Sequence, residues 1–399
     1  MLENRSIICF AHDWGGDPTS KTHIMRILSE KNRILWVNSI GMRRPTASGR
    51  DLRRLLMKLR RSLEGCSQIN ENLYTCNPLI LPLPGVLGVD AVNTWVLSAF
   101  LRHHMRRLEF RRPILWTFLP NVNGLVGRLR EELVVYHCVD EYTAFSGVAS
   151  QSLRRMERDL LGKADLVFAS SEQLCWERKP FNPRTYFISH GVDVTQFSRA
   201  FDPATRIPAD MEGIAGPVIG FFGLIADWID LPLIRHLALA RPSWSIVLVG
   251  KTTTELGPIT GLPNVHLLGQ KPYDLLPGYC KAFDVAIIPF QINELTIRAN
   301  PLKLREYLAA GLPVVSTDLP EIRKYQHLVR IANGPEAFFR EVELSLGERD
   351  VSLRQRRLES MKSESWEERV RELSSIITSV EYPRRAAQDS APLASPSVQ

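Results

Sequence analysis

Lys303 and Glu306, a lysine and a glutamate one helical turn apart, are the residues of this sequence most suited to chemistry. Proline suits the start of a helix and Gly311 suits its end, so residues 301–310 are predicted to be helical. The helix N-terminus, with Lys303 in its first turn and Arg298 just upstream, could hold a diphosphate. Glu306 lies roughly 4.5 Å further along the axis, where a carboxylate could accept hydrogen bonds from both hydroxyls of a ribose.

The residues on either side indicate how this helix is placed. The stretch 287–317 has the pattern of an apolar strand, a polar loop, the helix and a β-branched strand. The simpler alternative is an ordinary amphipathic helix whose lysine and glutamate face solvent and bind no ligand.

The motif P-x-K-x-x-E-Y-L-A-A-G-x-P-V-V, at residues 301–315, resembles a known segment. It is similar to the nucleotide-sugar segment of the retaining glycosyltransferases of family 4, also called group 1, which have the GT-B fold. In that family a Glu-x7-Glu motif places its first acid near the donor sugar and its second on the ribose. Glu306 matches the second acid, whereas Arg298 stands eight residues earlier, where the first is expected. Glu294 is the candidate replacement, and Asn300 is a further candidate donor contact.

A pair of glycines follows the first predicted strand. Residues 6–11 are short and apolar, the loop after them contains Gly15 and Gly16, and a helix is expected from Ser20. This order is typical of the start of a Rossmann-like unit, whose loop lies at the carboxyl edge of the sheet, where ligands bind. The resemblance implies that Gly15 and Gly16 contact the donor phosphates, although a glycine pair also makes ordinary turns.

An imidazole and two carboxylates follow the predicted strand 133–137. This segment reads Y-H-C-V-D-E-Y, and the end of a strand is the usual position for working residues in such sheets. In the family the corresponding loop carries a histidine near the donor sugar and the acceptor, which makes His137 and Asp140 the candidate catalytic residues. The alternative for His137 is a strand-end histidine bonded to the backbone.

The second half departs from the family in its cations. The apolar strand 217–222 is followed by Gly223, a candidate donor contact, but the arginine and lysine that family members commonly carry after this glycine are absent. Lys251, which directly follows another predicted strand, is the candidate to supply the missing charge together with Arg298 and Lys303.

The composition is that of a globular protein with ordinary cores. Of 399 residues, 44% are hydrophobic and 23% are charged, which excludes a chain that is disordered throughout. The six cysteines form no C-x-x-C pair and have no histidine at zinc-ligand spacing, so we expect reduced thiols and no metal. No apolar run approaches the roughly 18 residues that span a bilayer, and no signal sequence begins the chain.

Positive charge is concentrated in the first half. Residues 43–130 contain fifteen Lys or Arg against five Asp or Glu, whereas the whole chain has a net charge of +7. Basic amphipathic helices are expected at residues 50–61 and 100–112, with the apolar run 79–87 between them. This pattern favours docking on an anionic membrane surface, although a basic face kept in solvent is the alternative. Nucleic-acid binding is not expected, because aromatic residues are not interleaved with the arginines.

The alternation of strands and helices in both halves predicts an α/β protein of the GT-B class, with two Rossmann-like, doubly wound domains facing across a cleft. The expected N-terminal domain covers residues 1–200 and the linker residues 201–216. The nucleotide-sugar domain follows at 217–365, a helix crossing back to the first domain at 366–382, and a disordered tail at 383–399.

The resemblance implies a glycosyltransferase that moves a sugar from a nucleotide-diphosphate sugar to a lipid-linked or polysaccharide acceptor in bacterial cell-surface glycan synthesis. It implies retention of configuration, no metal cofactor, and a cytoplasmic enzyme bound peripherally to the inner face of the cell membrane. The subgroup that is most similar contains exopolysaccharide and teichuronic-acid enzymes. A GT-B sugar-nucleotide 2-epimerase and a catalytically silent scaffold remain alternatives. A dinucleotide dehydrogenase is excluded, because no G-x-G-x-x-G follows the first strand. The base, sugar, acceptor, linkage and oligomeric state stay open.

Overall fold

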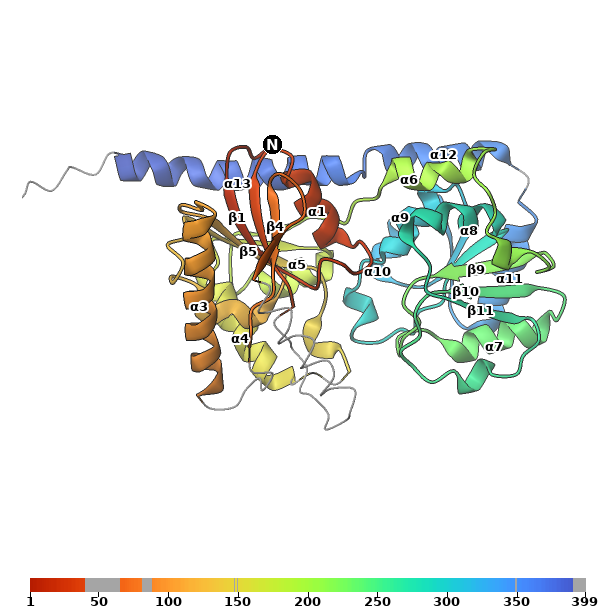
Figure 1. Cartoon of the computed structure of the whole chain (residues 1–399). Coiled ribbons are helices and arrows are strands. Elements are labelled where there is room, and N and C mark those ends of the chain that lie inside the picture. The colour runs from red at the N-terminus through yellow and green to blue at the C-terminus, as the bar shows by residue number, and fades with distance from the viewer. Residues whose placement is uncertain (40–64, 81–87, 147, 149, 349, 390–399) are drawn as a thin grey trace, which may run out of the picture.

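The computed structural model describes residues 1–39, 65–80, 88–146, 148, 150–348 and 350–389. These residues form two α/β domains, each built on one sheet, joined end to end (Figure 1). The predicted fold class, two doubly wound domains, is therefore confirmed. The predicted helix at 50–61 and most of the run 79–87 lie outside the described residues.

The first domain contains an 8-stranded sheet in the order β3-β4-β2-β1-β5-β6-β7-β8. All neighbours are parallel except β3 and β4, which form an antiparallel pair. The helices connecting parallel strands cover the faces of the sheet, so the strands are apolar on both faces. The strands are β1 (Ser6–Phe10), β2 (Arg33–Val37), β3 (Cys66–Gln68), β4 (Leu73–Cys76), β5 (Ile114–Thr117), β6 (Leu133–Cys138), β7 (Leu166–Ala169) and β8 (Thr185–Phe187), and the helices α1 (Ser20–Leu28), α3 (Val89–Arg107), α4 (Ser150–Lys163) and α5 (Glu172–Arg178).

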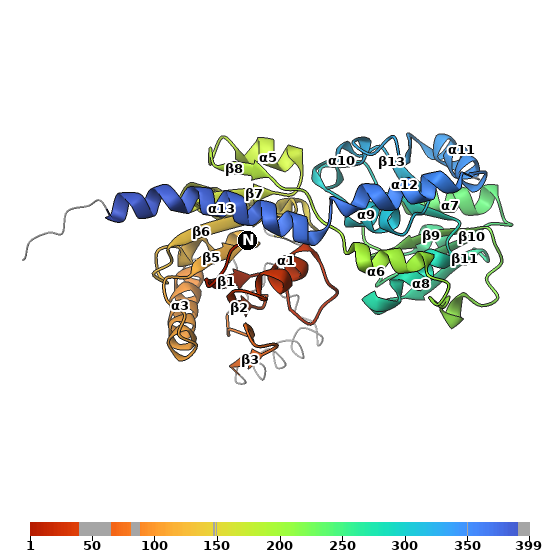
Figure 2. The ribbon, with the colours of Figure 1, turned by 90° about the horizontal axis from the view of Figure 1, so that it is seen from above.

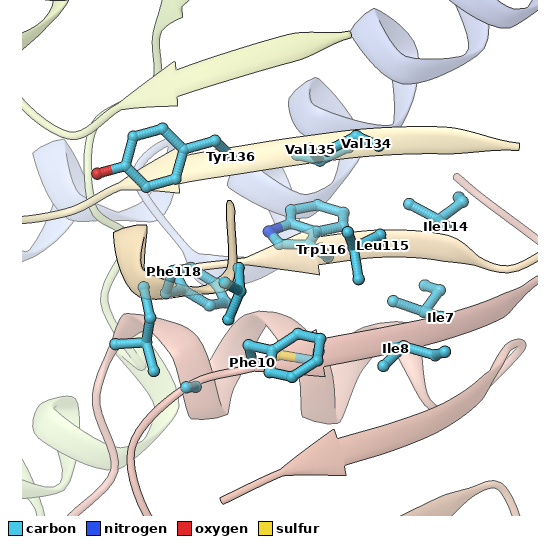
Figure 3. Close-up of a cluster of buried hydrophobic side chains, with 14 of the residues drawn as sticks. Ile7, Ile8, Phe10, Ile114, Leu115, Trp116, Phe118, Val134, Val135 and Tyr136 are labelled. Carbon is cyan, nitrogen blue, oxygen red and sulfur yellow. The ribbon is translucent and has the colours of Figure 1, made fainter. Parts of the chain in front are cut away.

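The centre of this sheet is a packed apolar core. Figure 3 shows buried side chains of the adjacent strands β1, β5 and β6, among them Phe10, Trp116 and Tyr136. These side chains are fully buried, and burying each large one stabilises the fold by about 1.5–3 kcal/mol. The carboxyl ends of these three central strands therefore form a rigid platform for the residues that follow them.

The second domain contains a 6-stranded parallel sheet in the order β11-β10-β9-β12-β13-β14. The strand order reverses at β9, which lies between β10 and β12, and such a switch point is where ligands bind in open α/β sheets. The strands are β9 (Val218–Phe222), β10 (Ser245–Val249), β11 (Val265–Gly269), β12 (Val285–Ile288), β13 (Val314–Thr317) and β14 (Arg330–Ala332), and the helices α6 (Val194–Ser198), α7 (Leu231–Ala240), α8 (Leu276–Ala282), α9 (Leu302–Ala309), α10 (Pro320–Arg323), α11 (Pro335–Leu346) and α12 (Val351–Lys362).

One long helix, α13 (Trp366–Asp389), returns from the second domain to the first (Figure 1 and Figure 2). Its apolar residues Trp366, Val370 and Leu373 belong to the core of the first domain, and it packs against α1. The helix extends beyond residue 382, where a tail was expected, and residues 390–399 lie outside the described part of the chain. The chain thus crosses between the domains twice.

A buried arginine contacts both segments that connect the two domains. Arg305 in α9 is 1% exposed, and its Nε lies 2.7 Å from Glu364 Oε2, just before α13. Its Nη2 donates to Ser189 Oγ at 2.5 Å and to Tyr325 OH at 2.8 Å. Ser189 follows β8 of the first domain, so this one side chain ties together both connecting segments and the second domain.

Some predicted boundaries differ from the structure. The second basic helix, expected at 100–112, is the end of α3, which begins at Val89 and stops at Arg107. The pair β3–β4 was not predicted, because its strands have only three and four residues and their apolar pattern is too short to detect.

We predict that Arg305→Met lowers the free energy of unfolding by about 3–5 kcal/mol, because it leaves the half-buried Glu364 carboxylate without its cationic partner. Guanidinium-induced unfolding measures this change. Arg356→Met is the control: its ion pair with Asp350 is exposed, so the loss should stay below about 1 kcal/mol. Equal effects of the two substitutions would contradict the role given to Arg305.

Candidate functional site

Two glycines lie at the carboxyl edge of the second sheet, where β9 and β10 end. Gly223 has φ +143° and Gly250 has φ +156°, conformations that residues with a side chain rarely adopt. A Cβ on Gly250 would lie 1.8 Å from the Gly223 carbonyl oxygen, and one on Gly223 would lie 2.9 Å from Cε of Lys303. Glycine is therefore required at both positions, and the backbone here directly contacts the Lys303 side chain.

Lys303 and Glu306 form an ion pair in α9. Lys303 Nζ lies 3.0 Å from Glu306 Oε2 and 5.0 Å from the centroid of the Phe222 ring. The helix begins at Leu302, one residue later than expected, with Pro301 as its N-cap. Glu306 is 8% exposed. The predicted pair is thus assembled at the positive end of a helix, where an ammonium with three donors stands beside a carboxylate with two acceptor oxygens.

Arg298 contacts the first domain. Its Nε lies 2.9 Å from both carboxylate oxygens of Glu177 in α5, and its Nη1 donates to the Glu294 carbonyl at 2.7 Å. The guanidinium charge is therefore compensated within the protein, and the structure places Arg298 as an interdomain ion pair, unlike the diphosphate contact expected. The partner was not foreseeable because Glu177 is 121 residues away in the chain.

The remaining three polar candidates of this domain have different surroundings. The Asn300 amide donates to the Ser170 carbonyl at 2.7 Å and accepts from Arg305 at 2.8 Å, so Asn300 is a buried interdomain contact. The exposed Glu294 carboxylate lies 3.5 Å from Arg298 Nη1, which makes it a partner of that arginine. Lys251 is exposed and stays beside the glycines, because it directly follows Gly250.

The glycine loop of the first domain reaches the second domain. Gly16 donates its N–H to the Asp13 carbonyl at 3.2 Å, which closes a turn, and a side chain on Gly15 would meet no atom within 4 Å. The next residue, Asp17, accepts a hydrogen bond from Gln270 Nε2 at 2.8 Å, just after β11. Gly15 and Gly16 therefore lie beside the junction of the two carboxyl edges.

His137 lies inside β6, because this strand extends to Cys138. The side chain is 2% exposed and stacks on Phe118 with ring centroids 4.9 Å apart. Burial, with the nearby Lys21 charge, lowers its pKa to about 3, so the ring is neutral. Its Nδ1 has no hydrogen-bond partner among the residues that the structure describes. This location does not support the role expected for His137, since proton transfer requires direct reach to the substrate.

Asp140 is the half-buried carboxylate of the same segment. Burial raises its pKa to about 6, although the charge of Lys21 in α1 acts in the opposite direction. Its neighbour Glu141 is held by Arg178, whose Nη2 lies 2.6 Å from Glu141 Oε2. Of the two carboxylates at this strand end, Asp140 is therefore the one suited to accept a proton near neutral pH.

Residues 216–347 match the family model described as glycosyl transferases group 1. The match is to the second domain, and it takes in about a third of the chain. The match covers the β9 and β10 glycines, Lys303 and Glu306, so the resemblance of residues 301–315 to this family is confirmed over the second domain.

A curated relative and two solved structures are similar to larger parts of the chain. The putative teichuronic acid biosynthesis glycosyltransferase TuaH of Bacillus subtilis (strain 168) is 29% identical over 231 residues, covering 54% of this chain. The match spans 58% of the length of that relative.

The solved structure of sucrose-phosphate synthase from Thermosynechococcus elongatus superposes on this chain with a TM-score of 0.68 at 14% identity, covering 95% of this chain and 100% of its own. Anabaena HepE in complex with UDP and glucose has a TM-score of 0.61 at 16% identity, covering 94% and 100%. These likenesses support the GT-B fold.

Lys21 is the main residue of the first domain that the sequence analysis did not identify. It lies in the first turn of α1, and its Nζ is 5.6 Å from the centroid of the Tyr142 ring. The sequence does show that Lys21 lies in the first turn of a helix that follows a glycine loop, and this pattern could have identified it. Its proximity to Tyr142 depends on the packing of α1 over the sheet and could not be predicted.

Within the described ranges, no group of three or more His, Cys, Asp or Glu side chains could hold a metal ion. In the same residues, no helix combines the length and apolar character needed to cross a membrane.

Proposed function

We propose that this protein is a glycosyltransferase that moves a sugar from a nucleotide-diphosphate sugar to a glycan acceptor in bacterial cell-surface polysaccharide synthesis. The observation that carries the proposal is the Lys303–Glu306 pair at the start of α9, beside two glycines that admit no side chain. The group 1 match of residues 216–347 and the similarity to TuaH support it.

Each part of this site corresponds to a part of the donor. The N-terminus of α9 and the Lys303 ammonium stabilise the negative charge that develops on the leaving diphosphate. The ammonium has three donors, so Lys303 can hold a phosphate oxygen and Glu306 together. Glu306 accepts hydrogen bonds from the ribose hydroxyls. The required glycines let the diphosphate approach the backbone closely. In this mechanism no metal ion is needed, and the configuration of the donor sugar is retained.

Asp140 acts on the acceptor in this proposal. Half-buried at the carboxyl edge of the first sheet, with a pKa of about 6, it accepts a hydrogen bond and then the proton of the acceptor hydroxyl. The acceptor is a lipid-linked saccharide or a growing polysaccharide, as the membrane surface described below suggests.

The exposed face of α3 is the proposed membrane contact. Near its start it presents Trp95, which is 66% exposed, and Val92, and towards its end Arg102 and Arg106 are exposed on the same side. Figure 1 shows α3 at the edge of the first domain, away from the second domain. An aromatic group with basic residues behind it suits the interface of an anionic bilayer. The enzyme would then work at the cytoplasmic face of the cell membrane.

A catalytically silent scaffold is the second candidate. The observation that favours it is Arg298, which replaces the first acid of the family motif and is bound to Glu177. Measured consumption of donor by the purified protein separates the two functions, since a scaffold would consume none.

We predict that Glu306→Gln weakens donor binding about tenfold or more, because a hydrogen bond to a charged group contributes about 1.5–3 kcal/mol. Calorimetric titration with UDP, GDP, dTDP and their sugar conjugates measures it. The control is Glu212→Gln, an exposed carboxylate in the loop before β9. Unchanged affinity in Glu306→Gln would remove the ribose role.

We predict an acid limb near pH 6 in kcat/KM. Because burial raises the pKa of Asp140 to about 6, the carboxylate takes up a proton as the pH falls through 6 and can no longer accept one. Asp140→Asn should lower kcat by about 10²–10⁴-fold and abolish the limb. Donor consumption is followed with membrane extract as acceptor, and Asp159→Asn on the surface of α4 is the control. An unchanged pH profile in Asp140→Asn would contradict this role.

We predict that Trp95→Glu reduces binding to vesicles containing phosphatidylglycerol by roughly tenfold, since it places a like charge and removes an interfacial aromatic group. Flotation with neutral and anionic vesicles measures it. Trp176→Glu is the matched control, because Trp176 is 73% exposed on α5, a different surface. Equal binding of the two variants would show that α3 is not the contact.

A further inference from the structure

The Lys21 cluster consists of His12, Lys21, His137, Asp140 and Tyr142, at or near the carboxyl ends of β1 and β6. Lys21 is its only cation, since burial lowers the pKa of His12 to about 4 and that of His137 to about 3, and the charge of Lys21 adds to both effects. The Lys21 side chain is half-buried, so it keeps some contact with solvent. Among the described residues, no hydrogen-bond or ion-pair acceptor lies next to its ammonium.

Several polar atoms of this cluster also have no partner. The Tyr142 hydroxyl, His137 Nδ1 and His12 Nδ1 are buried atoms that make no hydrogen bond within the described part of the chain, and Tyr142 and His137 are more than nine-tenths buried. Native proteins pair nearly all such groups, because an unpaired buried polar atom costs about 1–3 kcal/mol. A tyrosine hydroxyl and an ammonium are both donors, so the cluster is equipped to bind an acceptor-rich group.

A series of ring contacts connects the cluster to the second domain. The Tyr142 and Phe145 ring centroids lie 6.1 Å apart, and those of Phe145 and Trp228 lie 5.9 Å apart. Next to them, the Ser146 hydroxyl donates to the Asp227 carboxylate. Asp227 and Trp228 belong to the loop that follows Gly223. The Lys21 cluster therefore faces the segment that leads directly away from the proposed diphosphate site.

Three other cations near the contact between the two domains are already compensated. Arg298 is bound to Glu177, Arg305 to Glu364, and Lys303 to Glu306. Lys21 differs, because burial lowers its pKa even though the Asp140 charge acts against this. The loss of hydration of this ammonium is thus larger than the stabilisation that neighbouring charges provide. A negatively charged ligand would supply the missing stabilisation.

We propose that Lys21 binds an oxyanion of the substrate, a phosphate or carboxylate group, held between the two domains with the Tyr142 hydroxyl as a second donor. This inference rests on the proposed function. The oxyanion has two sources of the same chemistry: the diphosphate of the donor, or an acidic group of the acceptor saccharide. In either case, Lys21 supplies from the first domain part of the positive charge that is absent after Gly223.

The test compares Lys21→Met with the wild-type protein at pH 8, above the pKa of Asp140, so that Asp140 stays ionised. Two matched pairs of probes are titrated calorimetrically: a nucleoside diphosphate from the series UDP, GDP and dTDP against its nucleoside, and glucuronate against glucose. Lys179→Met, an exposed lysine after α5, is the control, and Lys21→Arg tests whether restored charge restores binding.

A loss of about tenfold or more for the nucleoside diphosphate alone, with the nucleoside unchanged, assigns the oxyanion to the donor. The same loss for glucuronate, with glucose unchanged, assigns it to the acceptor. If Lys21→Met binds every probe like the wild-type protein while Glu306→Gln loses the diphosphate, the inference is overturned and the proposed donor site stands. Binding of no probe by the wild-type protein would overturn both.

Discussion

The buried guanidinium of Arg305 is the interaction on which the arrangement of the two domains depends. It contacts Ser189, where the chain leaves the first domain, Glu364, where it returns, and Tyr325 within the second domain. Each contact is charge-assisted and shielded from water, so none is easily replaced by solvent. Because α9 carries Arg305 as well as Lys303 and Glu306, the helix that offers the diphosphate site is also the one fixed to both domains.

The carboxyl edges of the two sheets therefore meet between the domains, and they carry different functional groups. The second domain contributes the end of a helix, an ammonium and two glycines, which suit a diphosphate. The first domain contributes Asp140 and the Lys21 cluster, one proton acceptor beside one under-compensated cation. Contacts between Asp17 and Gln270 and between Phe145 and Trp228 hold the two edges together in this structure. This arrangement suits a reaction in which one domain binds the donor and the other domain binds the acceptor.

Arg298 stands where the family motif has an acid, and its positive charge is compensated by carboxylates of the first domain. The family motif has a glutamate at this position, whereas here the arginine binds Glu177 at 2.9 Å and lies 4.0 Å from Glu141. Carboxylates are thus still present near this place, but the first domain supplies them. The sequence of the second domain alone therefore showed the lost acid and not the carboxylates that the first domain places beside Arg298.

Local pattern determined much of this protein. Strand and helix periodicity predicted both α/β domains, and the motif at 301–315 predicted the positions of Lys303, Glu306 and the positive φ of Gly311, because these depend on residues within a few turns of each other. Only the tertiary structure decided which charges are free. Arg298 and Asn300 are occupied by residues of the other domain, His137 is buried among rings, and Lys21 lies beside Tyr142. Whether a polar side chain can meet a ligand depends on its partners and its burial, and for Arg298 and Asn300 these are set by residues more than a hundred positions away in the chain.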